Sequence, residues 1–228
     1  MLRSLFSEDG IRHLILLVPV ILVSISFHEY AHAWMADRLG DPSARYLGRL
    51  TLNPLKHFNI FGFLMMILVG FGWATPVPVN PNNFKNPSRG MLATALAGPI
   101  ANLTLAIASS LIYALLYQII VLVGISSDFQ VELLGNVFTL LLYLIYMNIG
   151  LAVFNLIPVY PLDGSRVLGY FLPTQYHDFM LKYGQYVQIG FVLIVLLTDV
   201  VGDIVGVVQS GVANLLISFW ELVLGVFF

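Results

Sequence analysis

The stretch IRHLILLVPVILVSISFHEYAHAWM, residues 11–35, indicates the class of fold. As a helix rising about 1.5 Å per residue, this mostly apolar stretch is long enough to cross the hydrocarbon core of a bilayer, about 30 Å thick. Its last third carries His28, Glu29 and His32. An ionisable side chain inside a membrane span costs roughly 3 kcal/mol, so its presence there indicates a functional site.

The composition of the whole chain extends this interpretation to the protein. Hydrophobic residues make up 59% of the 228 residues and charged residues 10%, whereas soluble domains are about 25% charged. This excess is too large for one soluble core and predicts an integral membrane protein. The net charge of −2 provides no basic surface, so nucleic acid is excluded as a partner. The absence of cysteine excludes disulfides and thiolate metal ligands.

Further apolar segments follow the first one along the chain. We predict an all-α polytopic membrane protein with five to six transmembrane helices, because four of these segments are long enough to span. The fifth is short and contains glycine. The four long segments are Met91–Ile125, Leu133–Ile157, Tyr183–Thr198 and Ile204–Phe227, and the short one is Phe58–Thr75.

The charges of the loops predict the topology. Residues 37–57 and 76–89 carry six of the ten Lys and Arg residues, and residues 158–182 carry two more, whereas the links at 128–132 and 199–203 carry none. Cytoplasmic loops are enriched in Lys and Arg, which places the first three loops in the cytoplasm. The loops before and after Phe58–Thr75 can both be cytoplasmic only if this segment enters and leaves the membrane on the same side. Phe58–Thr75 should therefore be a short re-entrant or membrane-surface segment. A β-hairpin formed by residues 50–55 and 77–80 is expected beside it, because both stretches have extended character.

The motif His28-Glu29-Tyr30-Ala31-His32 predicts a metal site on the first span. Residues four apart share one face of a helix, so both imidazoles can reach one metal ion while Glu29 stands beside them. Two neutral nitrogens and a neighbouring carboxylate are typical of a hydrolytic zinc site. The alternative is that the three side chains hydrogen-bond to one another inside a helix bundle.

Asp163 is the candidate for the third metal ligand. The topology places His28 and His32 toward the cytoplasmic end of the first span, so the third ligand should lie at a cytoplasmic end of another span. Asp163 follows the span that ends near Ile157, after two prolines that prevent the helix from continuing and before Gly164, which permits a sharp turn. Three protein ligands leave the fourth position that a catalytic zinc requires. The alternative is a solvated turn aspartate.

Two motifs in this order resemble those of the site-2 proteases, zinc metalloproteases that cleave their substrates within the membrane. They are HExxH at residues 28–32 and NxxPxxxLDG from Asn155 to Gly164. Gly98-Pro99-Ile100-Ala101-Asn102 also resembles a compact prokaryotic branch of this family that lacks PDZ and CBS domains. The resemblance covers the chain from about His28 to Gly164.

The resemblance implies a role for each motif residue. His28, His32 and Asp163 would bind one Zn²⁺ per chain, and Glu29 would act as the general base toward a water that the zinc activates. Asn155 would donate a hydrogen bond to the developing oxyanion or position the substrate; a helix C-cap amide is the alternative. Asn102 would support the site from behind the ligands, or else bridge two membrane helices. His57 is interpreted as structural.

The implied protein is an intramembrane zinc endopeptidase in a prokaryotic cell membrane, with its active site toward the cytoplasmic side. Residues 1–228 would form one metalloprotease domain, with a catalytic core at about 11–182 and two C-terminal membrane helices at about 183–228. The implied partners are the lipid bilayer and single-span membrane proteins or signal peptides as substrates, and the oligomeric state stays open. A divalent-metal transporter and an inactive membrane scaffold are the rival functions.

A substrate helix must unwind before one of its peptide bonds can be attacked, because helical amides are bonded internally. We therefore hypothesise that residues 50–55 or 77–80 present an edge strand that pairs with the unwound substrate. The alternative is a hairpin with a purely structural role.

Overall fold

A computed structural model of the protein describes residues 8–69 and 72–225. Long helices dominate this part of the chain, and two short 3₁₀ turns, η1 (Pro54–Lys56) and η2 (Pro81–Asn83), lie in its loops. The α-helices are α2 (Glu8–Arg38), α3 (Ser43–Tyr46), α4 (Ile60–Val69), α5 (Pro87–Val123), α6 (Asp128–Asn155), α7 (Asp163–Phe171), α8 (Thr174–Leu197) and α9 (Val200–Leu224).

Five helices of the described chain are long and apolar enough to cross a membrane: α2, α5, α6, α8 and α9. Each contains an 18-residue window with no more than two charged residues, and most residues of these windows are not buried inside the protein. Apolar side chains that face outward over such lengths require lipid around them. The prediction of an all-helical integral membrane protein is therefore confirmed.

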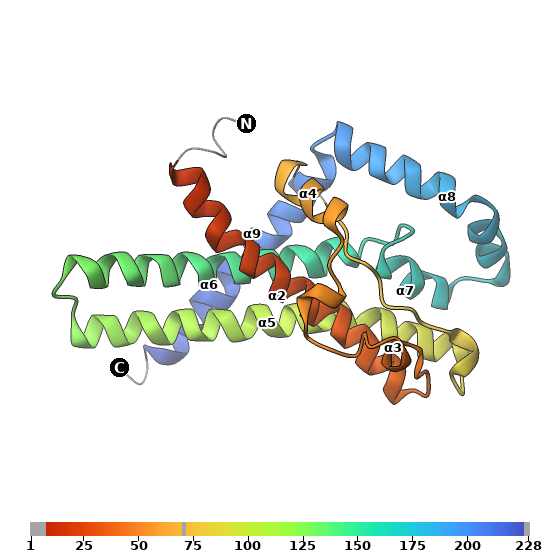
Figure 1. Ribbon diagram of the computed structural model, residues 1–228, viewed down its shortest axis with the longest axis horizontal. Coiled ribbons are helices and arrows are strands. Elements are labelled where there is room, and N and C mark those ends of the chain that lie inside the picture. Colours follow the sequence, from red (N-terminus) through yellow and green to blue (C-terminus); the bar gives the residue numbers. More distant parts are fainter. Residues whose placement is uncertain (1–7, 70–71, 226–228) are drawn as a thin grey trace.

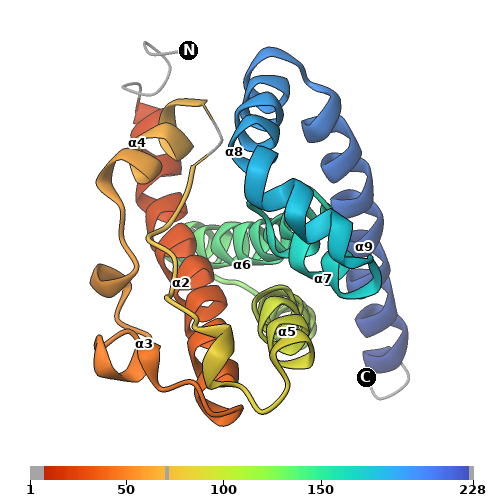
Figure 2. The same cartoon turned by 90° about the vertical axis from the view of Figure 1, so that its right-hand side faces the viewer.

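Helices α5 and α6 lie antiparallel, side by side, and α2 crosses both of them (Figure 1). Their link is short because Gly124, whose φ of 77° favours glycine, caps the end of α5, and α6 begins soon afterwards with a capping box of Ser127 and Gln130. Figure 2 shows α2, α3 and α4 on one side of this pair and α8 and α9 on the other. The candidate site lies where these three helices, α2, α5 and α6, meet the start of α7 (Asp163–Phe171).

Helix α4 is too short to cross a bilayer. Its 10 residues correspond to about 15 Å, half of the hydrocarbon thickness. The segment returns to its starting point, because Thr75 N donates to the carbonyl of His57 at 2.9 Å. His57 is fully buried and its Nε2 donates to the carbonyl of Thr51 at 2.8 Å, which agrees with the structural role predicted for it.

The predicted β-hairpin is not supported, because the described residues contain no strand. Residues 72–80 follow an elongated path without regular secondary structure (Figure 1), and we call them the extended segment. Side chains bind the backbone groups of this segment that a second strand would need. Glu29 accepts from Val77 N, Asp41 accepts from Asn80 N, and Arg49 donates to the carbonyls of Thr75 and Pro76. Prolines at 76 and 78 also remove two donors from the segment. Residues 54–56 form the turn η1 and end the other stretch.

The predicted loop at residues 158–182 is wrong in its extent. Helix α7 occupies Asp163–Phe171 inside it, and α8 already begins at Thr174. The first turns of α8 are polar (TQYHD, residues 174–178), so a hydropathy criterion misses them. Helix α7 is amphipathic and packs on α5, which is a tertiary contact that the hydropathy of the loop does not reveal.

Asp41 attaches the extended segment to the end of α2. This fully buried carboxylate accepts hydrogen bonds from Ser43 Oγ at 2.5 Å, Asn80 N at 2.7 Å and Asn83 Nδ2 at 2.7 Å. Burial raises the pKa of Asp41, but these hydrogen bonds lower it by more, so its pKa lies below the usual value.

We expect Asp41→Ala to lower the free energy of unfolding by about 2–4 kcal/mol, because it removes a charged acceptor and strands buried donors. Since the folded-state pKa of Asp41 lies below its unfolded value of 3.8, its contribution is present above about pH 4 and is lost as the pH falls through the folded-state pKa. Unfolding curves in detergent measure both effects. Asp178→Ala, at an exposed carboxylate, is the control and should change neither.

Candidate metal centre

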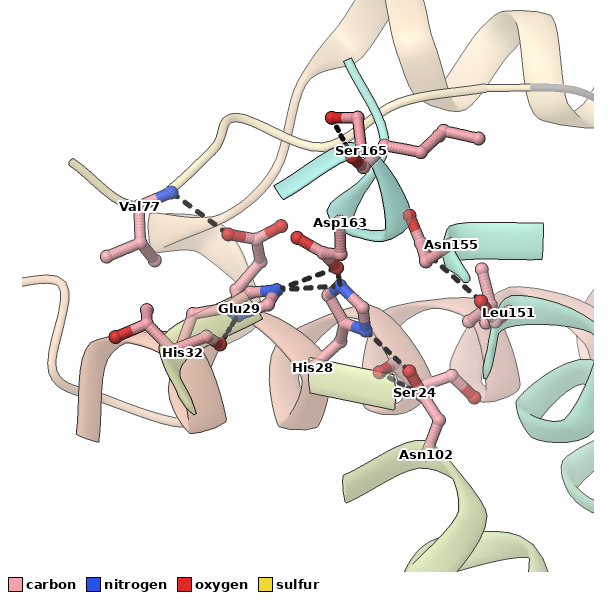
Figure 3. Close-up of polar contacts among 12 residues, drawn as sticks. Ser24, His28, Glu29, His32, Val77, Asn102, Leu151, Asn155, Asp163 and Ser165 are labelled. Carbon is pink, nitrogen blue, oxygen red and sulfur yellow. Dashed lines mark hydrogen bonds and ion pairs between the residues drawn. The ribbon is translucent and has the colours of Figure 1, made fainter. Parts of the chain in front are cut away.

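Two helices supply the three predicted metal ligands. His28 and His32 lie one turn apart on α2, and Asp163 is the first residue of α7. Asp163 Oδ2 lies 3.2 Å from Nε2 of each imidazole, and the two Nε2 atoms lie 3.0 Å apart (Figure 3). All three side chains are buried. The structure thus brings together His28, His32 and Asp163 in the arrangement that the sequence predicts.

Helix α5 determines the tautomer of both imidazoles. His32 Nδ1 lies 2.7 Å from the carbonyl of Thr94, which can only accept, so this nitrogen carries the proton. His28 Nδ1 lies 2.6 Å from Asn102 Oδ1. The Asn102 amide nitrogen donates to the carbonyl of Ser24, which fixes its oxygen toward His28 as an acceptor. In its neutral form each imidazole therefore presents an Nε2 lone pair to the centre of the site.

Three acceptor atoms then converge on one point, which fits a bound cation. The third acceptor is the carboxylate of Asp163, which faces both imidazoles. Its Oδ2 is buried and has no hydrogen-bond partner. Two nitrogen lone pairs and one carboxylate oxygen repel one another unless a cation lies between them, and this is a donor set that Zn²⁺ prefers.

A chain of buried amides supports His28 from behind. Asn102 on α5 accepts from His28 and donates to Asn148 Oδ1 on α6 at 2.7 Å. Asn148 in turn donates to Ser24 Oγ on α2 at 2.9 Å. Asn102 thus contacts a predicted ligand and also bridges helices. The two roles considered for it, support of the site and a link between membrane helices, are both present. Asn148 and Ser24 are not among the predicted residues, although an asparagine inside an apolar span is the signal that could have found Asn148.

We expect Asn102→Leu to weaken zinc binding by about 10–100-fold, because the Nδ1 proton of His28 loses its acceptor and the ring its fixed orientation. The measurement is the zinc dissociation constant of purified protein in competition with a chelator. Asn136→Leu, which changes an amide on α6 that contacts Arg12 rather than a predicted ligand, is the matched control. Equal affinities of the two variants would contradict the assignment.

Gly98 gives the imidazoles room against α5. A Cβ atom at this position would lie 2.4 Å from His32 Nε2 and 2.6 Å from His28 Cε1. Thr94, Gly98 and Asn102 are spaced by four residues, so they form one stripe along α5 that faces both histidines. Gly164 has a similar role after Asp163, since a Cβ there would lie 2.2 Å from the carbonyl oxygen of Leu156.

Glu29 lies beside the three predicted ligands and outside their triangle. One oxygen of its buried carboxylate accepts a hydrogen bond from Val77 N at 3.0 Å, and the other is turned toward the Asp163 side of the site (Figure 3). The carboxylate therefore has one oxygen held by the extended segment and one directed to the place where chemistry at the metal position would occur.

Asn155 is the last residue of α6. Its Nδ2 donates to the carbonyl of Leu151 in the same helix at 2.9 Å, which corresponds to the structural role considered for it. An amide has two N–H groups, and this bond uses one of them. The oxyanion role of Asn155 remains a prediction.

Comparisons with known proteins agree on one family. A sequence model of peptidase family M50, to which the site-2 proteases belong, matches residues 16–197, and neither a PDZ nor a CBS domain is matched. A Bacillus subtilis protein named as an inferred zinc metalloprotease is 37% identical over 183 residues, which are 79% of this chain and 78% of that protein. A zinc metalloprotease of Methanocaldococcus jannaschii is 27% identical over 157 residues, 69% of this chain and 34% of that protein. No solved structure matches this chain.

Proposed function

This chain belongs to peptidase family M50 and is a membrane-embedded metalloprotease, and from that premise we propose that it is an intramembrane zinc endopeptidase. Its substrates would be membrane proteins, cleaved in or near their transmembrane segments. The observation that carries the proposal is the convergence of three buried acceptor atoms, from His28, His32 and Asp163, within a bundle of membrane-spanning helices.

His28, His32 and Asp163 would hold one zinc ion per chain. When bound, the zinc would supply Lewis acidity and lower the pKa of a water to about 7. Other residues of the chain orient these side chains before the metal binds. Thr94 and Asn102 accept hydrogen bonds from Nδ1 of His32 and His28, and α7 positions Asp163 beside α2. Because the ligands come from α2 and α7, their spacing depends on the packed bundle.

Glu29 would act as the general base. It would accept a proton from the attacking water and deliver it to the leaving amide nitrogen, since its outer oxygen faces the site while the other is held by Val77. Asn155 would use its second N–H group to stabilise the oxyanion of the substrate.

The site would open toward the cytoplasm of a prokaryotic cell. The positive loops that carry Arg45, Arg49 and Lys85 lie between α2 and α5, next to the ligand end of α2, which supports this orientation. Single-span membrane proteins or remnant signal peptides would be the substrates.

We propose that the substrate binds in a cavity of about 490 Å³ beside the bundle. It is lined by α2, α4, α6, and the α8–α9 hairpin. Leu151 and Phe154 line it from the last turns of α6, so it extends toward Asn155. Its volume matches a short unwound segment rather than an entire helix.

Val79 would pair with the unwound segment of substrate. Its backbone makes no hydrogen bond with the described residues, whereas the carbonyl of Thr51 is taken by His57. We expect Val79→Pro, which removes this N–H, to raise KM about tenfold relative to Val79→Ala, which keeps it. Equal KM values for the two variants would eliminate the pairing.

The test of the proposed function is a cleavage assay with a panel of single-span substrates in proteoliposomes, combined with metal analysis of the purified protein. We expect bound zinc, cleavage within or beside the transmembrane segment, loss of cleavage with a chelator and recovery with added zinc. Zinc flux across the vesicle membrane without cleavage would instead establish the transporter. A protein that shows neither cleavage nor zinc flux, with or without added zinc, would establish the scaffold.

A further inference from the structure

The extended segment at residues 72–80 reaches the candidate site through one backbone group. Val77 N donates to Glu29 Oε2 at 3.0 Å, and both partners are buried. Pro76 and Pro78 flank Val77 and carry no N–H, so Val77 provides the only backbone donor of residues 76–78. A residue before proline is also confined to extended conformations, which restricts the direction of this N–H.

The side chain of Val77 also packs against α2. It packs in a buried cluster with Ala33 and Ala44. Glu29 and Ala33 are four residues apart, so they lie on one face of α2, and Val77 contacts both of them. Val77 is therefore held by its side chain on one turn of α2 and by its N–H on the preceding turn.

Hydrogen bonds on both sides of Val77 hold the extended segment in place. Arg49 Nη1 donates to the carbonyls of Thr75 and Pro76 at 3.1 and 3.2 Å. On the other side, Asn80 N donates to the buried carboxylate of Asp41 at 2.7 Å. A carboxylate on a flexible glutamate side chain gains a defined orientation only from a partner that is itself held in place.

We propose that the peptide N–H of Val77 is the positioning group for Glu29. It binds one carboxylate oxygen and thereby directs the other to the reacting atoms (Figure 3). This role rests on the proposed function, in which Glu29 is the general base. It also couples the base to the segment that contains Val79, so a substrate strand paired there acts on the same backbone that orients the base.

The kinetic test compares two variants of the zinc-loaded protein. Val77→Pro removes the N–H, whereas Val77→Ala removes side-chain packing but keeps the N–H and serves as the reference. We expect kcat of Val77→Pro to fall about tenfold below that of Val77→Ala, with KM and zinc content equal in the two, because a charge-assisted hydrogen bond that orients the base is lost. Equal kcat values would overturn the role of Val77.

A second measurement does not depend on the folding of the proline variant or on activity. In ¹⁵N-valine protein, the amide proton of Val77, assigned by its disappearance in Val77→Ala, should move upfield in Glu29→Gln, because a neutral amide is the weaker acceptor. An unmoved resonance would overturn the proposal. A wild-type chain that cleaves none of the substrates overturns the proposed function and this role together, whereas equal kcat in an active enzyme overturns this role alone.

Discussion

Glu29→Gln is expected to reduce kcat by about 10³-fold while the protein retains its zinc. The substitution keeps the size of the side chain and its contact with Val77, but a neutral amide cannot accept the proton of the attacking water. Metal content should be preserved because the predicted ligands are His28, His32 and Asp163, and Glu29 is not part of this group. Metal analysis and the turnover of a single-span substrate, measured on the same preparation, check both statements.

Glu221→Gln is the matched control for this prediction. Glu221 lies on α9, exposed and far along the chain from the ligands, so the loss of its charge should change neither zinc content nor kcat. If Glu29→Gln lost the zinc together with activity, Glu29 would be a ligand or a support of the ligands. If it cleaved at the wild-type rate, the general base would have to be another residue.

Gly98→Ala is expected to weaken zinc binding by at least 100-fold and to abolish detectable cleavage. The added Cβ atom would lie 2.4 Å from His32 Nε2 and 2.6 Å from His28 Cε1, so either α5 or the imidazoles must shift. The rings cannot turn away without losing the acceptors Thr94 O and Asn102 Oδ1, and both of these acceptors belong to α5 itself. A shift of α5 would therefore carry the acceptors away from the rings.

Gly135→Ala is the control, because the same substitution at this position should not destabilise the protein. It lies in helix α6, and a Cβ atom there would have no heavy atom within 4 Å. Since alanine favours helix by about 1 kcal/mol over glycine, this variant should be neutral or slightly more stable. Chelator competition and thermal unfolding distinguish a specific loss of the site from a general loss of fold. A Gly98→Ala protein with wild-type zinc affinity would contradict the close packing of α5 on the histidines.

Local patterns in the sequence were sufficient for the spans and for part of the site. Apolar length alone predicts the five long helices, and the four-residue spacing predicts that His28 and His32 share one face. Asp163 follows from topology, because loop charge places it at the same end of the bundle. The β-hairpin at 50–55 and 77–80 was not supported, since alternating apolar residues indicate extended backbone but do not specify what its hydrogen bonds contact.

The partners of the site residues could not be predicted in this way. Asn102 meets His28 across 74 residues, Asn148 meets Asn102 across 46, and Val77 meets Glu29 across 48. Nothing in the local sequence around these residues specifies such pairs. They depend on the rotation and the depth of each helix in the bundle, which are determined by packing along its entire length.

The sequence by itself therefore determined the membrane class, the helical architecture and the shared helix face of His28 and His32, because hydropathy and helical spacing are local properties. It predicted Asp163 as their partner from the charges of the loops. Only the tertiary structure decided which atoms orient those ligands: the carbonyl of Thr94, the amides of Asn102 and Asn148, the space at Gly98 and the N–H of Val77. Hydrogen bonds act over about 3 Å, so their partners are defined only once separate helices are packed against one another.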